Sequence, residues 1–296
     1  MHRLLRAIGF SDILTYEQEK MILEKTLDER HRTDFISLDD GNVLEEYRLQ
    51  VAPSMGIALV GVRDKDGIFH KEYYFPYMRA YDGTETVEAS VERHAQQETY
   101  AGVLEDYQAG ITLIFYVMNS VQLRQLSRMG TPVHANRAYL TGLSTEGTIL
   151  LPVEKSQIAE AEHTLRERKE QQRLYEAARQ GDQEAIETLT ETERHMMDEI
   201  MARIATEDLY TLVESTFMPT GVECDMYAVI GEIQAIKVKS NVYTHEKVVD
   251  LKLDCNGCIF HVCINEADLQ GVPAIGRRFK GKIWMQGVLE VVEEEG

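Results

Sequence analysis

The chain has 296 residues, a length typical of about two domains. It carries 31 Lys and Arg against 50 Asp and Glu, which gives a formal net charge of −19. The summed field of such a protein repels nucleic-acid phosphates and anionic lipid surfaces. The charge therefore excludes a generally basic nucleic-acid-binding protein and argues against a membrane-surface protein, while a local basic patch stays open.

The sequence predicts a cytoplasmic protein with reduced thiols. The first 30 residues lack the pattern of a signal peptide, because the apolar stretch 4–10 is interrupted by Arg6 and followed by acidic sequence. The longest apolar runs, 57–62 and 111–118, fall short of the ~18–20 residues that span a bilayer and fit buried strands. Four cysteines are few for a secreted disulfide framework.

Residues 1–152 are predicted to form an α+β domain. Thr15 and Gln18 have the spacing of a capping box that opens a helix, with Met21, Ile22 and Leu27 on its apolar side. Further along, strands are expected at 47–51, 56–63, 68–75, 111–118, 139–143 and 148–153, with a helix at 119–128.

Short turns join two pairs of these strands. The sequences at 64–67 and 144–147 each predict a hairpin between the strands that flank them. Parallel strands need crossovers of about a dozen residues or more. The turns therefore predict an antiparallel sheet in this domain rather than a doubly wound nucleotide-binding fold.

Residues 153–220 are predicted to form a helical segment, because they are rich in the good helix formers Glu, Arg, Gln and Ala. Thr190 and Thr206 have the positions of helix N-caps, and Pro219 is expected to end a last helix that carries Phe217. A stripe of apolar residues recurs at helical spacing: Met197, Ile200, Met201 and Ile204. We interpret this stripe as core between helices, with a docking groove as the alternative.

Residues 221–296 are predicted to form a small β-barrel, similar to an oligonucleotide/oligosaccharide-binding (OB) fold. Apolar residues alternate along 227–235, and Asn256-Gly257 between two alternating runs is typical of a two-residue hairpin. The long alternating strand at 279–291 contains glycines, which suit tight curvature or close backbone approach. This layout is an analogy of fold, and fold alone does not set function.

The cysteines of this segment have the spacing of a metal site but alternate between the faces of the predicted hairpin. Cys255 and Cys258 form a CxxC pair that His261 and Cys263 follow closely. In the hairpin register one face is uniformly apolar and holds Val249, Leu251, Leu253, Cys255, Cys258, Phe260, Val262 and Ile264. Because His261 and Cys263 lie on the opposite face, we predict a structural hairpin, with a metal site and a redox dithiol as the alternatives.

The last strand carries a basic strip made of Arg277, Arg278, Lys280, Lys282 and Trp284, the single Trp of the chain. Alternation places Arg278, Lys280, Lys282 and Trp284 on one face of the strand. Cations for phosphates and an aromatic ring for stacking predict a site for single-stranded nucleic acid or another anionic ligand. A contact between domains or subunits, or a solvated strand that blocks edge-to-edge aggregation, are the alternatives.

The chain holds spacings that resemble catalytic motifs, and each is incomplete. Residues 276–282 match G-x4-G-K, but Ile283 stands where a phosphate-binding loop needs Ser or Thr. Glu160 and His163 form half of a di-iron motif whose other half is absent from the sequence. We therefore predict no cofactor, no metal site and no catalytic residue. An aromatic group either packs in the core or lines a pocket: Tyr73, Tyr74, Phe75, Tyr77 and Tyr81.

Four stretches carry a resemblance to a known family. They are the opening run 2–11, the runs 217–219 and 223–225, and the run 276–287. On these residues the chain resembles, over essentially its full length, an uncharacterised clostridial (Firmicutes) family with a domain of unknown function. The resemblance implies a bacterial cytoplasmic protein and supplies no activity, cofactor or catalytic residue.

These observations favour a non-enzymatic binding or scaffolding protein whose partner is another protein or a second copy of the chain. Binding of single-stranded nucleic acid or another anionic ligand through the C-terminal barrel is one alternative. An enzyme with an unrecognised site in the N-terminal domain is the other. No membrane partner is expected.

Overall fold

The computed structural model describes residues 3–13, 15–80, 89–93, 100–106, 111–128, 135–152, 215–220 and 224–291. The chain divides into two compact units, one formed by residues 1–150 and 215–296 and the other by 151–214. The described residues are mostly β-strand with few helices. The predicted helical segment lies almost entirely outside the described residues.

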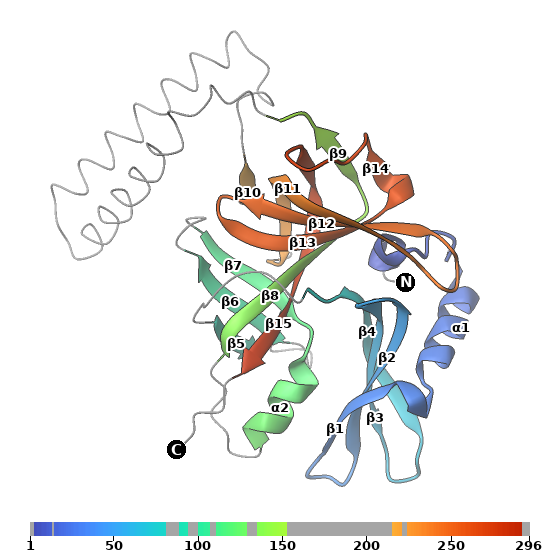
Figure 1. The fold of residues 1–296 in the computed structure, drawn as a ribbon. Helices are drawn as coiled ribbons and strands as arrows, with labels where there is room; N and C mark the ends of the chain where they lie inside the picture. Colours follow the sequence, from blue (N-terminus) through green and yellow to red (C-terminus); the bar gives the residue numbers. More distant parts are fainter. Residues whose placement is uncertain are drawn as a thin grey trace, which may run out of the picture. The chain divides into compact units, whose positions relative to one another are not determined.

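The first sheet, here called sheet A, is an antiparallel meander (Figure 1). Its strands, in spatial as well as chain order, are β1 (Arg32–Ser37), β2 (Val43–Ala52), β3 (Met55–Arg63) and β4 (Phe69–Met78). The predicted turn at 64–67 is confirmed: Asp64 Oδ1 accepts hydrogen bonds from the backbone of Asp66 and Ile68, and Gly67 has a φ of 82°. The antiparallel N-terminal sheet is thus confirmed as well.

The described part of the chain has short helices, and they are η1 (Arg3–Ile8), α1 (Tyr16–Thr26), η2 (Glu29–His31), α2 (Ser120–Arg128) and η3 (Glu266–Asp268). The predicted capping box is confirmed, since Thr15 and Gln18 each bond the backbone N–H of the other. Leu23 packs into the core, whereas Met21 is 70% exposed. The expectation that Met21 lies on the apolar side of α1 was therefore wrong.

A second, larger sheet combines strands from both ends of the chain. Its members are β5 (Ala89–Arg93), β6 (Tyr100–Asp106), β7 (Ile111–Val117), β8 (Ala135–Ser144), β9 (Gly147–Leu150), β10 (Thr216–Pro219), β11 (Met226–Ser240), β12 (Lys247–Cys255), β13 (Cys258–Asn265), β14 (Leu269–Gln270) and β15 (Arg278–Val291). The first and last of the three predicted parts therefore contribute strands to one sheet. Phe217 lies on β10, an edge strand that tolerates Pro219, and not on the predicted helix.

Five strands of this sheet close into a ring. The pairs β11–β12, β12–β13, β13–β8, β8–β15 and β15–β11 return to the strand where they start. All are antiparallel except β13–β8, which is parallel. In Figure 1 the green strand β8 lies between the orange-red strands β13 and β15. A strand from the first half of the chain therefore completes a ring built by the second half.

The predicted hairpin at 144–147 was wrong, because β8 and β9 do not pair with each other. Both run antiparallel to β15, with Gly142 opposite Met285 and Gly147 opposite Gly281. Ser144 Oγ lies 2.8 Å from the carbonyl oxygens of Glu146 and Lys282. Residues 144–147 therefore separate two strands that run in the same direction along β15, and they do not reverse the chain.

The interior of the ring is apolar, as the alternation predicts. All eight residues of the predicted face are at most 2% exposed and share one core with Phe279, Ile283 and Met285 of β15. The ladder pairs Cys255 with Cys258 across the Asn-Gly turn. Glycine allows the close approach expected on β15, since a Cβ on Gly287 would lie 2.5 Å from Phe115 Cδ2.

Candidate functional site

The basic strip begins at Arg277, directly before β15, and continues along that strand, and its members differ sharply in exposure. Arg278 and Trp284 are buried, at 4% and 8% exposure. Arg277 and Lys280 are half-buried, and the Lys282 side chain is 60% exposed. The strip therefore exposes Lys282 and part of Lys280, while Arg278 and Trp284 on either side of them are buried.

Trp284 is a structural side chain and not an exposed ring. Its Nε1–H donates to Asp225 Oδ2 at 2.7 Å, and its ring lies 5.1 Å from the ring of Tyr116. Burial with a satisfied indole N–H is the usual state of a core Trp. A nucleobase arriving from solvent therefore finds no open indole face beside the cations of the strip.

Arg277, Lys280 and Lys282 keep partial or full exposure to solvent. Lys282 Nζ is 3.6 Å from Glu146 Oε1, and both side chains are more than half exposed, so this ion pair is weak. Arg277 Nη1 donates to the carbonyl of Val272 at 2.8 Å. In the ladder Lys280 lies opposite Ile230 of β11 and Thr148 of β9. Of these three cations, Lys282 is the most exposed to solvent.

The opposite side of the ring carries a buried charged group that the sequence analysis did not assign. His261 Nδ1 lies 2.7 Å from Asp250 Oδ1, and Lys239 Nζ lies 2.9 Å from Asp250 Oδ2. Burial raises the pKa of Asp250, but the His261 hydrogen bond and the Lys239 charge outweigh it and leave that pKa below its ordinary value. The alternation of β12 and β13 places Asp250 and His261 on one face, and Lys239 comes from β11. Alternation alone does not show that this face is buried.

The N-terminal segment covers this face of the ring. Asn241 Nδ2 donates to the carbonyls of Ile8 and Gly9 at 2.9 and 3.1 Å. Arg6 Nη2 donates to Asp268 Oδ1 at 2.7 Å. These contacts, made by the opening run that carries the family resemblance, close the outer face of β12 and β13 to large ligands.

The cysteines behave as small apolar residues. None of the four forms a disulfide; Cys224 is exposed, and the other three are buried. Burial raises the pKa of Cys255 to about 12, and burial also raises the pKa of Cys263, which contacts the carbonyl of Ala7. Within the described ranges no group of three or more His, Cys, Asp or Glu is placed to hold a metal ion. The predicted split of the cluster between opposite faces is confirmed by the register.

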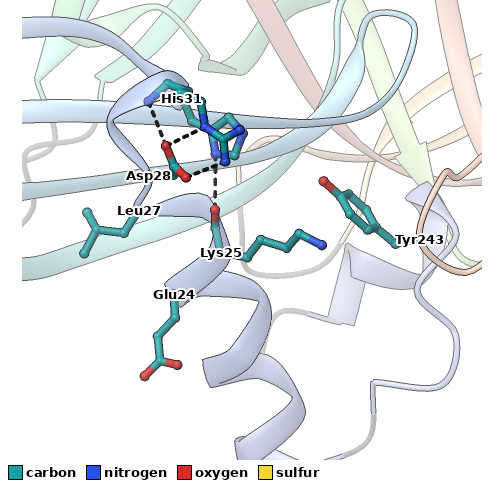
Figure 2. A pocket seen from close by; sticks show the side chains of 7 residues that line it. Glu24, Lys25, Leu27, Asp28, His31 and Tyr243 are labelled. Atoms are coloured by element: carbon teal, nitrogen blue, oxygen red, sulfur yellow. Dashed lines mark hydrogen bonds and ion pairs between the residues drawn. The ribbon is translucent and has the colours of Figure 1, made fainter.

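A shallow pocket lies at the C-terminal end of α1 (Figure 2). It is lined by Glu24, Lys25, Leu27, Asp28, Arg30, His31 and Tyr243. Lys25 Nζ lies 4.0 Å above the Tyr243 ring, and Arg30 pairs with Asp28 at 2.7 Å. The arginine holds the pKa of Asp28 well below its usual range. Lys25 already lies over the Tyr243 ring, and Arg30 already pairs with Asp28, so the pocket leaves few polar groups available to a ligand.

The aromatic group lies largely in the core of sheet A. Phe75 and Tyr77 are buried, Tyr73 and Tyr74 are half-buried, and Tyr81 lies outside the described residues. The Arg48 guanidinium lies 4.9 Å from the Tyr77 ring and forms an ion pair with Glu46.

This buried ion pair is the polar feature of sheet A that the sequence analysis missed. Arg48 alternates with apolar residues in the strand expected at 47–51, which is typical of a residue that faces solvent, but its side chain is only 8% exposed. Burial raises the pKa of Glu46, and the positive charge of Arg48 opposes that shift. Both faces of β2 are covered, and a two-residue period cannot reveal a second buried face.

In the part of the chain that the structure describes, no helix is both long and apolar enough to traverse a bilayer. Comparison with curated proteins and with solved structures finds no match. A family described as "Domain of unknown function, E. rectale Gene description (DUF3881)" matches residues 5–287. That match includes sheet A and nearly all of the ring. The chain therefore belongs to this family, as the resemblance of its opening, central and C-terminal runs implied.

Proposed function

We propose that this protein is a non-enzymatic binding or scaffolding protein, and that its basic strip holds an acidic segment of a partner protein. The observation that carries the proposal is the Lys282 side chain, which is 60% exposed on β15, with the half-buried Lys280 two residues before it and Arg277 directly before the strand. The ion pair of Lys282 with Glu146 is weak because both side chains are more than half exposed, so an acidic segment displaces little at Lys282 when it binds. The four free cysteines support the cytoplasmic location of such a protein.

The charge of the whole protein favours a short acidic segment over a long polyanion. A net charge of −19 repels a nucleic acid at long range. At physiological ionic strength, charges more than about 8 Å apart are largely screened, so a ligand small enough to contact only the strip responds mainly to its cations. Binding of this kind is expected to be weak and to fall as salt rises.

A direct test uses a fluorescein-labelled peptide of alternating Asp and Glu with Ser spacers, followed by fluorescence anisotropy. The double variant Lys280→Glu with Lys282→Glu is expected to abolish binding and leave the melting temperature nearly unchanged. The matched control Lys20→Glu with Lys65→Glu makes the same change in net charge at exposed sites elsewhere and is expected to keep most of the affinity. Equal loss in both double variants would refute the assignment to the strip.

A second candidate function is binding of single-stranded nucleic acid or another anionic ligand by an OB-like barrel. The five-stranded ring with one parallel pair supports the comparison with that fold. Against it, Asp250, His261 and Cys263 on the outer face of β12 and β13 are buried. A labelled oligo(dT) that binds with a steep salt dependence would favour this candidate, and no binding at low salt would dismiss it.

A further inference from the structure

The turn between β12 and β13 holds the single Asn-Gly pair of the sequence, Asn256-Gly257. In an unfolded chain an asparagine that precedes glycine is especially prone to deamidation, because glycine has no side chain to hinder the approach of its nitrogen to the asparagine side chain. Asn256 is exposed, so water reaches it. The turn lies outside the basic strip, and its chemistry does not depend on the proposed function.

Deamidation begins with the closure of a succinimide ring. The Gly257 backbone nitrogen attacks Cγ of Asn256 and loses its proton to solvent, and the side-chain nitrogen of Asn256 leaves as ammonia. Water then opens the ring at either of its two carbonyl carbons, which gives aspartate or isoaspartate. Ring closure therefore requires the Gly257 nitrogen to lie on the same side of the Asn256 Cα–C bond as the asparagine Cβ.

The hairpin holds the pair in a conformation that opposes ring closure. The ladder pairs Cys255 with Cys258, so Asn256 and Gly257 form a two-residue turn, and their φ values are 57° and 86°. Positive φ at both central residues is typical of a type I′ turn, in which ψ of the first residue is about +30°. At that ψ the Gly257 nitrogen points away from the Asn256 Cβ, and a rotation of more than about 90° is needed before the nitrogen reaches Cγ.

Both groups that react are also bonded to the protein. The Gly257 N–H donates to Asp254 Oδ1 at 2.8 Å, and Ser215 Oγ donates to Asn256 Oδ1. Ser215 directly precedes β10, which is paired with β11 of the ring. Rotation of the Gly257 nitrogen toward Cγ breaks its bond to Asp254, and the Asn256 side chain must also leave Ser215. Exposure to water alone therefore does not make Asn256 reactive.

We propose that Asn256 is a deamidation site whose reaction is confined to molecules in which the turn between β12 and β13 has opened. Ser215 and Asp254 hold the pair in its unreactive conformation while the turn is closed. The conversion rate in native protein is then the rate in the unfolded chain multiplied by the fraction of open molecules. An aspartate product suits a type I′ turn and lets the hairpin close again. Isoaspartate adds an atom to the backbone of the turn and prevents the register that pairs Cys255 with Cys258.

Peptide mapping by mass spectrometry, after digestion at low pH, measures the conversion of Asn256 in the full-length protein. We expect conversion in native protein to be at least about tenfold slower than in urea at the same pH and temperature. Equal rates would overturn the proposal, because the turn would then give no protection. An absence of conversion in urea would also overturn it, because Asn256 would then not be a deamidation site.

The variant Ser215→Ala tests the contact that holds the asparagine side chain. Loss of this hydrogen bond is expected to raise the conversion rate in native protein about fivefold and to leave the rate in urea unchanged. Ser240→Ala, at an exposed serine of β11, is the matched control and is expected to change neither rate. No rise in Ser215→Ala, or an equal rise in both variants, would overturn the role of Ser215. The comparison of native with urea-treated wild type does not depend on either variant folding.

Discussion

Replacement of Asp250 by Asn probes the buried charged group on the outer face of the ring. The Asp250 side chain is 5% exposed and neutralises Lys239, which is 13% exposed, while it also contacts His261. The amide keeps the size of the carboxylate but leaves the lysine without its opposite charge. Removing one partner of a buried ion pair costs about 3–5 kcal/mol, and the partial exposure of Lys239 places this case near 3 kcal/mol. That value corresponds to a change of more than about a hundredfold in the unfolding equilibrium constant.

Urea unfolding followed by Trp284 fluorescence measures this loss, because the single Trp is buried in the native state. Asp66→Asn, at an exposed residue, is the control and is expected to change stability by less than about 0.5 kcal/mol. If Asp250→Asn lowered the free energy of unfolding by no more than Asp66→Asn does, the assigned role of Asp250 in neutralising Lys239 would be refuted.

The pH dependence has a definite sign. The folded pKa of Asp250 lies below that of an unfolded aspartate, about 3.9, so its contribution is fully present above that pH. It is lost as the pH falls through the folded pKa. The difference between wild type and Asp250→Asn is therefore expected to stay constant near neutral pH and to shrink below about pH 4. A difference that grows on acidification would contradict the assignment.

Two further predictions concern the thiols and the ring. In native protein at pH 8 a disulfide reagent is expected to react rapidly with Cys224, which is exposed. The other three thiols are buried, and burial raises the pKa of Cys255 to about 12, so these thiols are expected to react only after unfolding. Two or more rapidly reacting thiols in the native state would contradict this. A fragment of residues 215–296 lacks β8, so the edges of β13 and β15 that pair with β8 are left unpaired. We expect this fragment to show no cooperative melting by circular dichroism. A fusion that adds residues 135–150 is expected to melt cooperatively again. Cooperative melting of the fragment alone would show that the ring does not need β8.

Local rules predicted the hairpin of β12 and β13 to the residue. The Asn-Gly turn fixes the register, and the two-residue period then assigns every side chain from Val249 to Ile264 to a face. The capping box at Thr15 and the turn after Arg63 are local in the same sense. Each of these features depends on residues close together in sequence, and such interactions can be evaluated without knowing the fold.

The errors arose where distant segments decide the outcome. The turn-like sequence after Ser144 was expected to form a hairpin, but β15 pairs with the strands on both sides of it. Trp284 and Arg278 alternate with core residues of β15 and are nevertheless buried, because other parts of the chain cover this face of the ring. A single sequence carries no signal for the parallel pair β13–β8, which joins residues far apart in the chain.

The position of β8 in the ring also has a consequence for the time course of synthesis. A ribosome completes Ser144 long before it reaches Lys247, so the closing strand emerges with neither of its ring partners yet made. Contacts between residues far apart in sequence form slowly, and an unpaired apolar strand is prone to aggregate with other chains until its partner strands are present. We therefore expect the nascent chain to expose an unpaired β8 edge until β13 and β15 have been synthesised.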